Sequence, residues 1–261
     1  MILEDYHVHT NLSDGNNSLE EMVRAAIDLG LRKIGFSDHI YTSFDLSYCL
    51  TKEKTREYIE TLKVLKDKYK EKITIYTGIE CDYYSDYPLD EFDYVIGSVH
   101  YVNKDGKYYS VDSKEEGFLK TVKEIYNGNY YEIAKDYYNN VADVLNKTNA
   151  DIIGHFDLIT KYNEDCKLFD MRNEEYLSYA KKAIDKLIPY NKPFEVNTGA
   201  ISRGYRTTPY PDLPLLKYIK EKGGRVILTS DSHSVNTICN YFNEFENLIK
   251  ETGFTDYIFK I

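Results

Sequence analysis

Short apolar runs alternate with amphipathic stretches along the whole chain, and each apolar run has the length of a β-strand. Seven such runs occupy residues 1–6, 33–37, 73–78, 94–99, 150–154, 193–197 and 225–229. Strands that alternate with helical stretches are typical of parallel sheets whose strands are joined by crossover helices. Seven strands in a chain of 261 residues favour an α/β barrel over an open sheet. In such barrels the chemistry lies at the C-terminal ends of the strands.

The amphipathic stretches predict the crossover helices. Apolar residues at helical spacing mark five of them, over 18–30, 51–69, 129–145, 173–187 and 212–223. The first begins with a capping box formed by Ser18 and Glu21 and stops at Gly30. Asn173 and Asp212 are the expected N-caps of the last two. The remaining polar stretches are interpreted as loops, and because no linker or repeat interrupts the pattern, the sequence predicts a single domain over 1–261.

The charge and the cysteines of the chain narrow its expected partners and location. The formal net charge of −10 argues against a broad surface for nucleic acid or anionic membranes. No apolar stretch approaches the roughly 18 to 20 residues that span a bilayer. Four cysteines without a CxxC pair favour a reducing, cytoplasmic location, and acidic Glu4 and Asp5 argue against a signal peptide. A small phosphorylated substrate agrees with this charge, because metal ions reverse the field within one cleft.

All six histidines stand at, or just beyond, the ends of predicted strands. In chain order they are His7, His9, His39, His100, His155 and His233. A single histidine at such a place is more often structural than a ligand. The strand ends of a parallel barrel converge on one rim, however, so six histidines gathered there predict a metal site.

Three carboxylates accompany the histidines on this rim. They are Asp14 in the first loop, Glu80 after the third strand and Asp231 after the seventh. From spacing alone Asp14 is equally well interpreted as a turn residue, because it precedes Gly15. Asp38, beside His39 on an extended segment, faces the other way and is expected to support the ligands rather than bind metal.

Imidazole and carboxylate together suit zinc, manganese, iron or cobalt ions, and the lack of a thiolate pair argues against a closed structural zinc site. The spacing of two residues puts His7 and His9 on one face of an extended segment, and likewise Asp231 and His233. Nine candidate ligands are too many for one ion, so the pattern predicts two to three divalent ions. Glu80 is the expected bridge, since a carboxylate is able to join two ions and an imidazole is not.

The motifs around these residues resemble the PHP (polymerase and histidinol phosphatase) superfamily, and within it the histidinol phosphatase branch. In chain order the matching segments are His7-Val8-His9-Thr10, Ser13-Asp14-Gly15, Ser37-Asp38-His39, Gly78-Ile79-Glu80, Gly97-Ser98-Val99-His100, Gly154-His155, Glu195-Val196-Asn197-Thr198 and Ser230-Asp231-Ser232-His233. They run through nearly the whole chain. The resemblance implies a distorted seven-stranded (β/α)7 barrel with a trinuclear metal centre at the strand ends.

The resemblance also implies how the ligands divide among the ions. One ion would be held by His7, His9, Glu80 and Asp231; a second by Glu80, His100 and His155; and a third by Asp14, His39 and His233. Some branches of the superfamily have a histidine at the position of Asp14, so this chain departs from them there.

The reaction implied by the resemblance is hydrolysis of L-histidinol phosphate to L-histidinol and phosphate, a step of histidine biosynthesis. The expected nucleophile is a hydroxide that bridges metal ions, with Glu80 as the bridging carboxylate. Asp231 or His233 would protonate the leaving alkoxide, directly or through a water. Arg203 after the sixth strand and Lys161 after the fifth are candidate phosphate-binding residues. Each is alternatively a solvated loop charge.

Other functions of the same barrel stay open at this point. A phosphoesterase acting on nucleotides, sugar phosphates or phosphotyrosine would use a similar centre, although the 195–203 segment favours the histidinol phosphatase branch. A non-catalytic PHP-like module is disfavoured, because every ligand position is filled. The expected partner is therefore a small phosphate ester, and the sequence does not indicate the oligomeric state. Tyr41, Asp45 and Tyr101, just beyond strand ends, are candidates for contacting the rest of the substrate.

Overall fold

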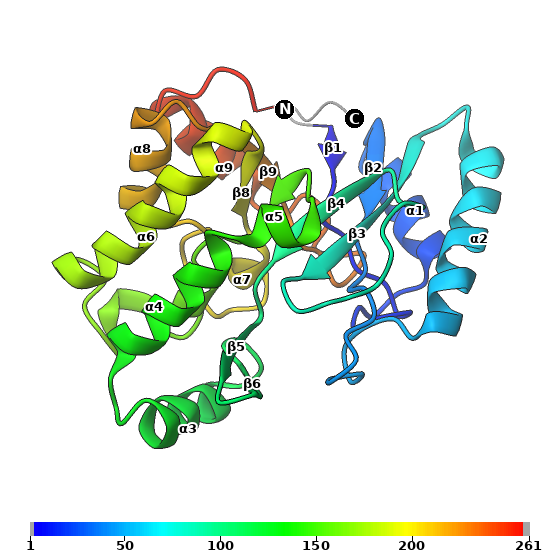
Figure 1. The fold of residues 1–261 in the computed structure, drawn as a ribbon. Coiled ribbons are helices and arrows are strands. Elements are labelled where there is room, and N and C mark those ends of the chain that lie inside the picture. Colours follow the sequence, from blue (N-terminus) through cyan, green and yellow to red (C-terminus); the bar gives the residue numbers. More distant parts are fainter. Residues whose placement is uncertain (1–2, 258–261) are drawn as a thin grey trace.

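Seven parallel strands form the centre of the structure, a computed structural model that describes residues 3–257 (Figure 1). In order around the sheet they are β1 (Glu4–Asp5), β2 (Lys33–Phe36), β3 (Thr74–Asp82), β4 (Tyr94–Ser98), β7 (Ile152–Ile153), β8 (Pro193–Asn197) and β9 (Arg225–Thr229). The segments that follow β1 and β9 meet: His9 N donates to Ser232 O over 2.8 Å, and Ser232 N donates to His7 O over 3.0 Å. The expected distorted, seven-stranded barrel is therefore confirmed, and it is nearly closed.

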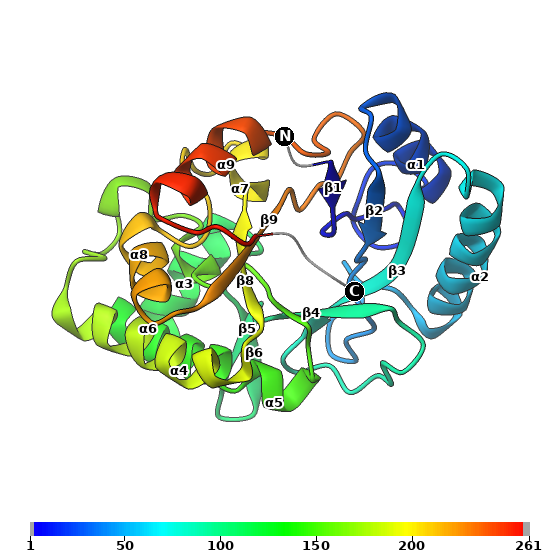
Figure 2. The same ribbon diagram turned by 90° about the horizontal axis from the view of Figure 1, so that it is seen from above.

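Helices pack around the outside of the strands (Figure 2). α1 (Leu19–Asp28) and α2 (Lys52–Tyr69) lie beside β2 and β3, whereas α6 (Glu174–Leu187), α8 (Leu213–Glu221) and α9 (Phe242–Glu251) lie around β8 and β9. The other helical elements are α3 (Glu115–Ile125), α4 (Tyr130–Val141), α5 (Val144–Thr148), α7 (Gly199–Ser202) and the short 3-10 helices η1 (Leu158–Thr160), η2 (Glu164–Cys166) and η3 (Ile188–Tyr190). Among the described residues, no helix combines the length and the apolar character that crossing a membrane requires.

A tyrosine from β4 reaches the backbone just after β1 and at the end of β2. The Tyr94 hydroxyl donates to Tyr6 O over 2.5 Å and to Phe36 O over 3.2 Å. Its ring leaves no room for side chains opposite, since a Cβ atom at Gly35 would lie 2.3 Å from the hydroxyl and one at Gly78 would lie 2.1 Å from the ring. The glycines of β2 and β3 are therefore required by this close approach.

All seven predicted strands are present, with some ends shifted. Met1 and Ile2, which belong to the first predicted strand, lie outside the described residues. β3 is longer than predicted and continues to Asp82, so Glu80 lies within this strand and not after it. The sequence prediction was wrong on that detail, because polar residues near the barrel rim do not end a strand whose backbone stays paired with β4.

The five predicted helical stretches all contain helices, and two predicted caps are confirmed. The Ser18 side chain accepts from Glu21 N while the Glu21 carboxylate accepts from Ser18 N, and Asn173 caps α6 through its side chain. Asp212 precedes α8 as predicted but makes no capping hydrogen bond. Its carboxylate accepts instead from Arg206, so the ion pair takes the oxygen that a cap would have used.

The structure adds elements where the sequence predicted loops. β5 (Tyr101–Lys104) and β6 (Lys107–Ser110) form an antiparallel hairpin directly after the fourth barrel strand, and α3 follows the hairpin. α9 closes the chain beside β9. The helix predicted over 129–145 is two helices, α4 and α5, separated at Ala142 and Asp143. The hairpin matters most, because it stands at the rim that carries the predicted ligands.

Candidate metal centre

All nine predicted ligands converge at the C-terminal end of the barrel. Each has a nitrogen or oxygen within 3.3 Å of another member of the set, which consists of His7, His9, Asp14, His39, Glu80, His100, His155, Asp231 and His233. Their ligand atoms form three overlapping groups, each within 4.8 Å: His9, Asp14, His39 and His233; His7, His9 and Glu80; and His39, Glu80 and His100. The strand ends therefore meet as the sequence predicted.

Glu80 lies at the centre of these groups, with its two oxygens facing different imidazoles. Its Oε2 lies 3.1 Å from His7 Nε2, 3.4 Å from His9 Nε2 and 3.1 Å from His39 Nδ1. Its Oε1 lies 2.9 Å from His155 Nε2 and 3.3 Å from His100 Nε2. A carboxylate placed between two sets of imidazoles in this way is arranged to bridge two ions.

Asp14 joins a separate group at the outer side of the centre. Its Oδ2 lies 3.2 Å from His233 Nε2 and 3.6 Å from His39 Nε2, and its Oδ1 lies 3.6 Å from His9 Nδ1. Gly15 follows in a tight turn whose N–H donates to Thr10 O over 2.8 Å. Asp14 is thus a turn residue whose carboxylate also faces three imidazoles.

The two most central carboxylates, Glu80 and Asp231, carry the negative charge that binding of a cation requires. Burial opposes the charged form of Glu80, yet the imidazoles of His39, His7 and His100 hold its pKa well below the usual range. Burial likewise opposes charge on Asp231, whose pKa is held low by Arg203 and His7. Both carboxylates are therefore ionised, as metal ligands must be.

The residues fit divalent ions because several buried donors have no other partner. Both ring nitrogens of His9, and Nδ1 of His155, lack a hydrogen-bond partner within the described part of the chain. Burial, followed by the charges of His233 and His39, lowers the pKa of His9 to about 3, so its imidazole is neutral. Buried polar atoms are normally paired. Buried imidazole nitrogens without other partners that converge with ionised carboxylates are suited to cations.

Two carboxylates that the sequence analysis did not single out hold the imidazoles in place. Glu195 Oε1 lies 2.6 Å from His7 Nδ1, and its Oε2 accepts from His155 N over 2.8 Å. Asp82 Oδ2 lies 3.2 Å from His100 Nδ1 and accepts from His100 N over 2.9 Å. Such contacts fix the tautomer and the orientation of a metal-binding imidazole. The available signals were the position of Asp82 two residues after Glu80 and the place of Glu195 in the matching segment Glu195-Val196-Asn197-Thr198.

Asp38 has the supporting position that its place beside His39 suggested. Its carboxylate accepts from Thr10 N over 2.8 Å and from Thr10 Oγ1 over 2.9 Å, and it also accepts from Ser13 Oγ. These bonds shape the first loop, which carries Asp14. Asp38 therefore supports the centre indirectly, by fixing the loop that positions Asp14.

Arg203 reaches the centre from the end of α7. Its Nη2 donates to Asp231 Oδ2 over 3.0 Å, and its Nη1 lies 2.8 Å from His233 Nδ1. Asp231 has a positive φ of 47° and packs against Gly199, where a Cβ atom would lie 2.7 Å from the carboxylate. The backbone here is held in an uncommon conformation that turns the carboxylate toward the other ligands.

Two adjoining cavities, which share lining residues, open onto the centre. One of about 160 Å³ is lined by ligands together with Asp112, Lys161 and Arg203. The other, of about 240 Å³, is also lined by Lys161 and Asp112 and extends to Asp45 and Tyr101. Lys161 and Arg203, the predicted phosphate contacts, thus both line the smaller cavity. Of the three residues expected to reach the rest of the substrate, Asp45 and Tyr101 line a cavity, whereas Tyr41 lines neither.

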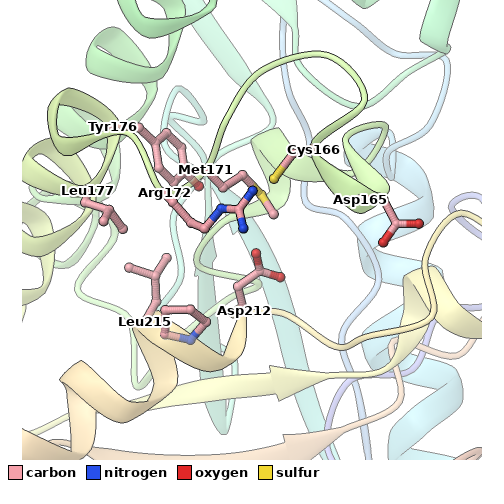
Figure 3. A pocket seen from close by; sticks show the side chains of 9 residues that line it. Asp165, Cys166, Met171, Arg172, Tyr176, Leu177, Asp212 and Leu215 are labelled. Carbon is pink, nitrogen blue, oxygen red and sulfur yellow. The ribbon is translucent and has the colours of Figure 1, made fainter.

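A further cavity of about 330 Å³ lies away from the ligands (Figure 3). Asp212, Met171 and Arg172 line it, and none of the nine predicted ligands does. The buried Arg206 pairs with Asp212 at the edge of this cavity, and the charge of Asp157 also stabilises the Arg206 cation. The pKa of Asp157 is raised to about 7, first by burial and then by the charge of Asp212. Arg206 is therefore a structural cation, unlike Arg203.

The comparisons with known sequences agree with this geometry. The family described as "PHP domain" matches residues 5–199. A protein of Schizosaccharomyces pombe named "Probable histidinol-phosphatase" is 26% identical over 91% of this chain and 82% of its own length. A protein of Deinococcus radiodurans with the same name is 26% identical over 95% of this chain and 93% of its own length.

Solved structures of similar fold extend the comparison. A putative histidinol phosphatase of Listeria monocytogenes superposes with a TM-score of 0.79 at 19% identity, covering 93% of this chain and 99% of its own. A histidinol phosphate phosphatase of Lactococcus lactis, solved with zinc, L-histidinol and phosphate, superposes with a TM-score of 0.70 at 24% identity, covering 97% and 95%. These likenesses confirm the barrel.

Proposed function

The chain belongs to the PHP domain family, and on that premise we propose that it is a metal-dependent phosphomonoesterase that hydrolyses L-histidinol phosphate to L-histidinol and phosphate in histidine biosynthesis. The observation that carries the proposal is Glu80, buried between two sets of imidazoles with one oxygen toward each. Relatives that match most of the chain are named histidinol phosphatases, and a similar fold binds zinc, L-histidinol and phosphate.

The proposed centre holds two to three divalent ions, with zinc, manganese, iron and cobalt as the candidates. His7, His9, Glu80 and Asp231 form one ligand set; Glu80, His100 and His155 form a second; and Asp14, His39 and His233 form a third. Separations of 3.3 Å between His9 and Asp231, 2.9 Å between His155 and Glu80, and 3.2 Å between His233 and Asp14 support this division. When bound, such ions lower the pKa of water and neutralise phosphate charge.

The residues around the centre take the remaining roles. Arg203 and Lys161 line the cavity beside the ligands and are the proposed phosphate contacts. Asp231 Oδ1 and His233 Nδ1 lie 3.5 Å apart, and either residue is placed to direct a proton from a water to the leaving alkoxide. We also propose that the whole chain is one domain and that it works in the cytoplasm, where its four unpaired cysteines would stay reduced.

A panel of phosphate monoesters tests the proposed function. The panel contains L-histidinol phosphate, a nucleoside monophosphate, a sugar phosphate and a phosphotyrosine peptide, each assayed with manganese, zinc, cobalt or ferrous iron. We expect the highest kcat/KM for L-histidinol phosphate. A clear preference for one of the other esters would assign the protein to a different substrate, and no phosphate release with any metal would refute the phosphatase itself.

A further inference from the structure

The larger cavity beside the centre has the chemistry of a specificity pocket. Its volume is about 240 Å³, and it begins at His39 and His100, two of the proposed ligands. Beyond them it is lined by two carboxylates that belong to no ligand set, Asp45 and Asp112, and by aromatic side chains. Among the described residues that line it, Lys161 is the only lysine or arginine. Such a pocket suits an aromatic, cationic group.

Asp45 is held rigidly with one acceptor site to spare. Its Oδ1 accepts from Ser47 N over 3.0 Å and from Ser47 Oγ over 2.6 Å, while its Oδ2 accepts from the Tyr101 hydroxyl over 2.8 Å. Burial would raise the pKa of Asp45, but these hydrogen bonds outweigh it and lower the pKa. An ionised carboxylate offers about four acceptor sites. Oδ2 is therefore free to take one more N–H.

Aromatic side chains line the same pocket, and one of them packs against a proposed ligand. The Tyr48 ring lies 4.8 Å from the His39 ring at an interplanar angle of 75°, and 6.1 Å from the Tyr101 ring. Phe44 packs edge-on against Tyr101 at 4.9 Å. Tyr48 and Tyr101 therefore offer fixed ring surfaces on which a flat heterocycle is able to pack.

Asp112 occupies the junction between the two cavities, since it lines both. Its backbone carbonyl accepts from Lys161 Nζ over 2.6 Å and from the Tyr162 hydroxyl over 2.8 Å, which fixes the chain at this point. Its Oδ1 accepts from Ser110 Oγ over 3.1 Å. Its Oδ2 forms an ion pair with Lys161 Nζ at 3.7 Å, a separation beyond hydrogen-bond distance. Asp112 thus presents a carboxylate oxygen that still has open acceptor sites where the two cavities adjoin.

We propose that Asp112 binds the ammonium group and Asp45 an imidazole N–H of the substrate, so that together they determine its specificity. The proposal rests on the proposed function. In L-histidinol phosphate the carbon that bears the amine adjoins the carbon of the ester oxygen, so the ammonium must lie close to the phosphate. Asp112 borders both cavities and satisfies this condition. The imidazole extends further, into the pocket that Asp45 and Tyr48 line.

Two substrate analogues separate the two roles. O-phosphoethanolamine keeps the ammonium and lacks the imidazole, whereas 3-(imidazol-4-yl)propyl phosphate keeps the imidazole and lacks the ammonium. Asp112→Asn should lower kcat/KM about ten- to a hundredfold for L-histidinol phosphate and O-phosphoethanolamine but not for the propyl ester. Asp45→Asn should lower it by a similar factor for the two imidazole compounds but not for O-phosphoethanolamine. The loss should appear mainly in KM, and the Kd of L-histidinol measured by calorimetry should rise in both variants.

Asp67→Asn, at a position 81% exposed on α2, is the matched control and should change nothing. An equal loss of kcat/KM for all three substrates would overturn the proposal, because it would show that the carboxylates act on the whole centre. The proposal would also fail if each variant showed the pattern expected of the other, or if neither lost kcat/KM for any substrate. If the parent protein does not prefer L-histidinol phosphate in the first place, it is the proposed function that fails. Metal content measured for each variant separates lost ions from lost contacts.

Discussion

At the scale of single residues, Glu80 is the side chain on which the centre depends most. It is 1% exposed, and five imidazoles surround its two oxygens. A neutral amide of the same shape has one oxygen and two N–H donors, so one set of imidazoles would face hydrogens in place of an acceptor. The site would then lose its bridging ligand without losing volume.

Glu80→Gln should therefore lower both metal content and turnover while the barrel stays folded. Elemental analysis of the purified variant should find fewer ions per chain than the two to three expected for the parent, and kcat should fall with them. Glu60→Gln, on the exposed side of α2, is the matched control. Full occupancy and full activity in Glu80→Gln would contradict the bridging role.

Arg203 supplies the second test at this scale. Removing one charge-assisted contact typically costs about 1.5 to 3 kcal/mol, or roughly ten- to a hundredfold in kcat/KM. Arg203→Ala should lose about this much, and inorganic phosphate should inhibit it less strongly than the parent. Arg203→Lys should recover only part of the loss, because an ammonium lacks the planar fork of a guanidinium.

The contact between Arg203 and Asp231 gives this test a sharper control. If Arg203 binds phosphate, the Ala variant keeps its metals and loses rate and phosphate affinity. If Arg203 acts only by holding Asp231, metal content falls and phosphate inhibition stays parental in the fully loaded protein. Arg56→Ala, at an exposed position of α2, should behave as the parent does.

The convergence of the nine candidate ligands was predictable from sequence because one physical rule places them: side chains at the C-terminal ends of parallel strands meet. Glu195 does not follow this rule, because it lies in the middle of β8, and its partner His7, 188 positions away, is fixed only by folding. Asp82 does lie at the C-terminal end of β3, but its contact with His100 is likewise fixed only by folding. The same holds for Asp112, whose loop reaches the centre through a hairpin that the sequence analysis took for a loop.

At the scale of elements, the barrel strands were predicted well because their apolar runs are continuous. Each element that the sequence analysis missed lacks a local signal, either an apolar run or a side-chain N-cap. The β5–β6 hairpin turns at Asp105 and Gly106, which have φ values of 52° and 77°. This Asp-Gly pair was a legible hairpin signal, but Lys107 and Tyr108, which begin the second strand, are exposed, so no apolar run marked that strand. α3 and α9 have no side-chain N-cap, so their starts had no marker in the sequence.

The packing of α1 against α2 carries a pH dependence that belongs to this scale. Glu20 Oε1 accepts from Arg24 Nη2 over 2.6 Å and from Lys68 Nζ and the Tyr69 hydroxyl over 2.8 Å each. The hydrogen bond from Lys68, followed by those from Tyr69 and Arg24, lowers the pKa of Glu20 from 4.5 to about 2. Because the pKa is lower in the folded protein, this cluster stabilises it above pH 4.5 and the contribution is lost as the pH falls toward 2.

Glu20→Gln should consequently lower the Tm at neutral pH by no more than a few degrees, since the carboxylate is solvent-accessible. The difference from the parent should narrow as the pH is lowered from 4.5 toward 2. Calorimetry on metal-free samples of both proteins measures this without interference from ion release. A difference that stays constant, or widens, across that range would refute the assignment, and Glu60→Gln again serves as the control.

At the scale of the whole molecule, the candidate centre is also the closure of the barrel. The segments after β1 and β9 meet through His9 and Ser232. His9 is itself a proposed ligand, and Ser232 lies between two others in the sequence, Asp231 and His233. Ligands come from the ends of six of the seven barrel strands, and the seventh, β8, carries Glu195. Residues far apart in the chain thus share one buried site, and ions bound there would tie the first strand to the last.

Removing the ions should therefore weaken the fold as well as the activity. A ligand that binds only the folded state at a free concentration of 100 times its Kd contributes about 2.7 kcal/mol, which for a chain of this size corresponds to a Tm shift of about 5 to 10 °C. Dialysis against a chelator should lower the Tm by at least this much, and returning zinc or manganese should restore it. Glu80→Gln, which lacks the proposed bridge, should respond less to both treatments. If the parent's Tm is the same with and without chelator while phosphate release is abolished, the ions serve the chemistry alone, and backbone pairing such as that between His9 and Ser232 suffices to close the barrel.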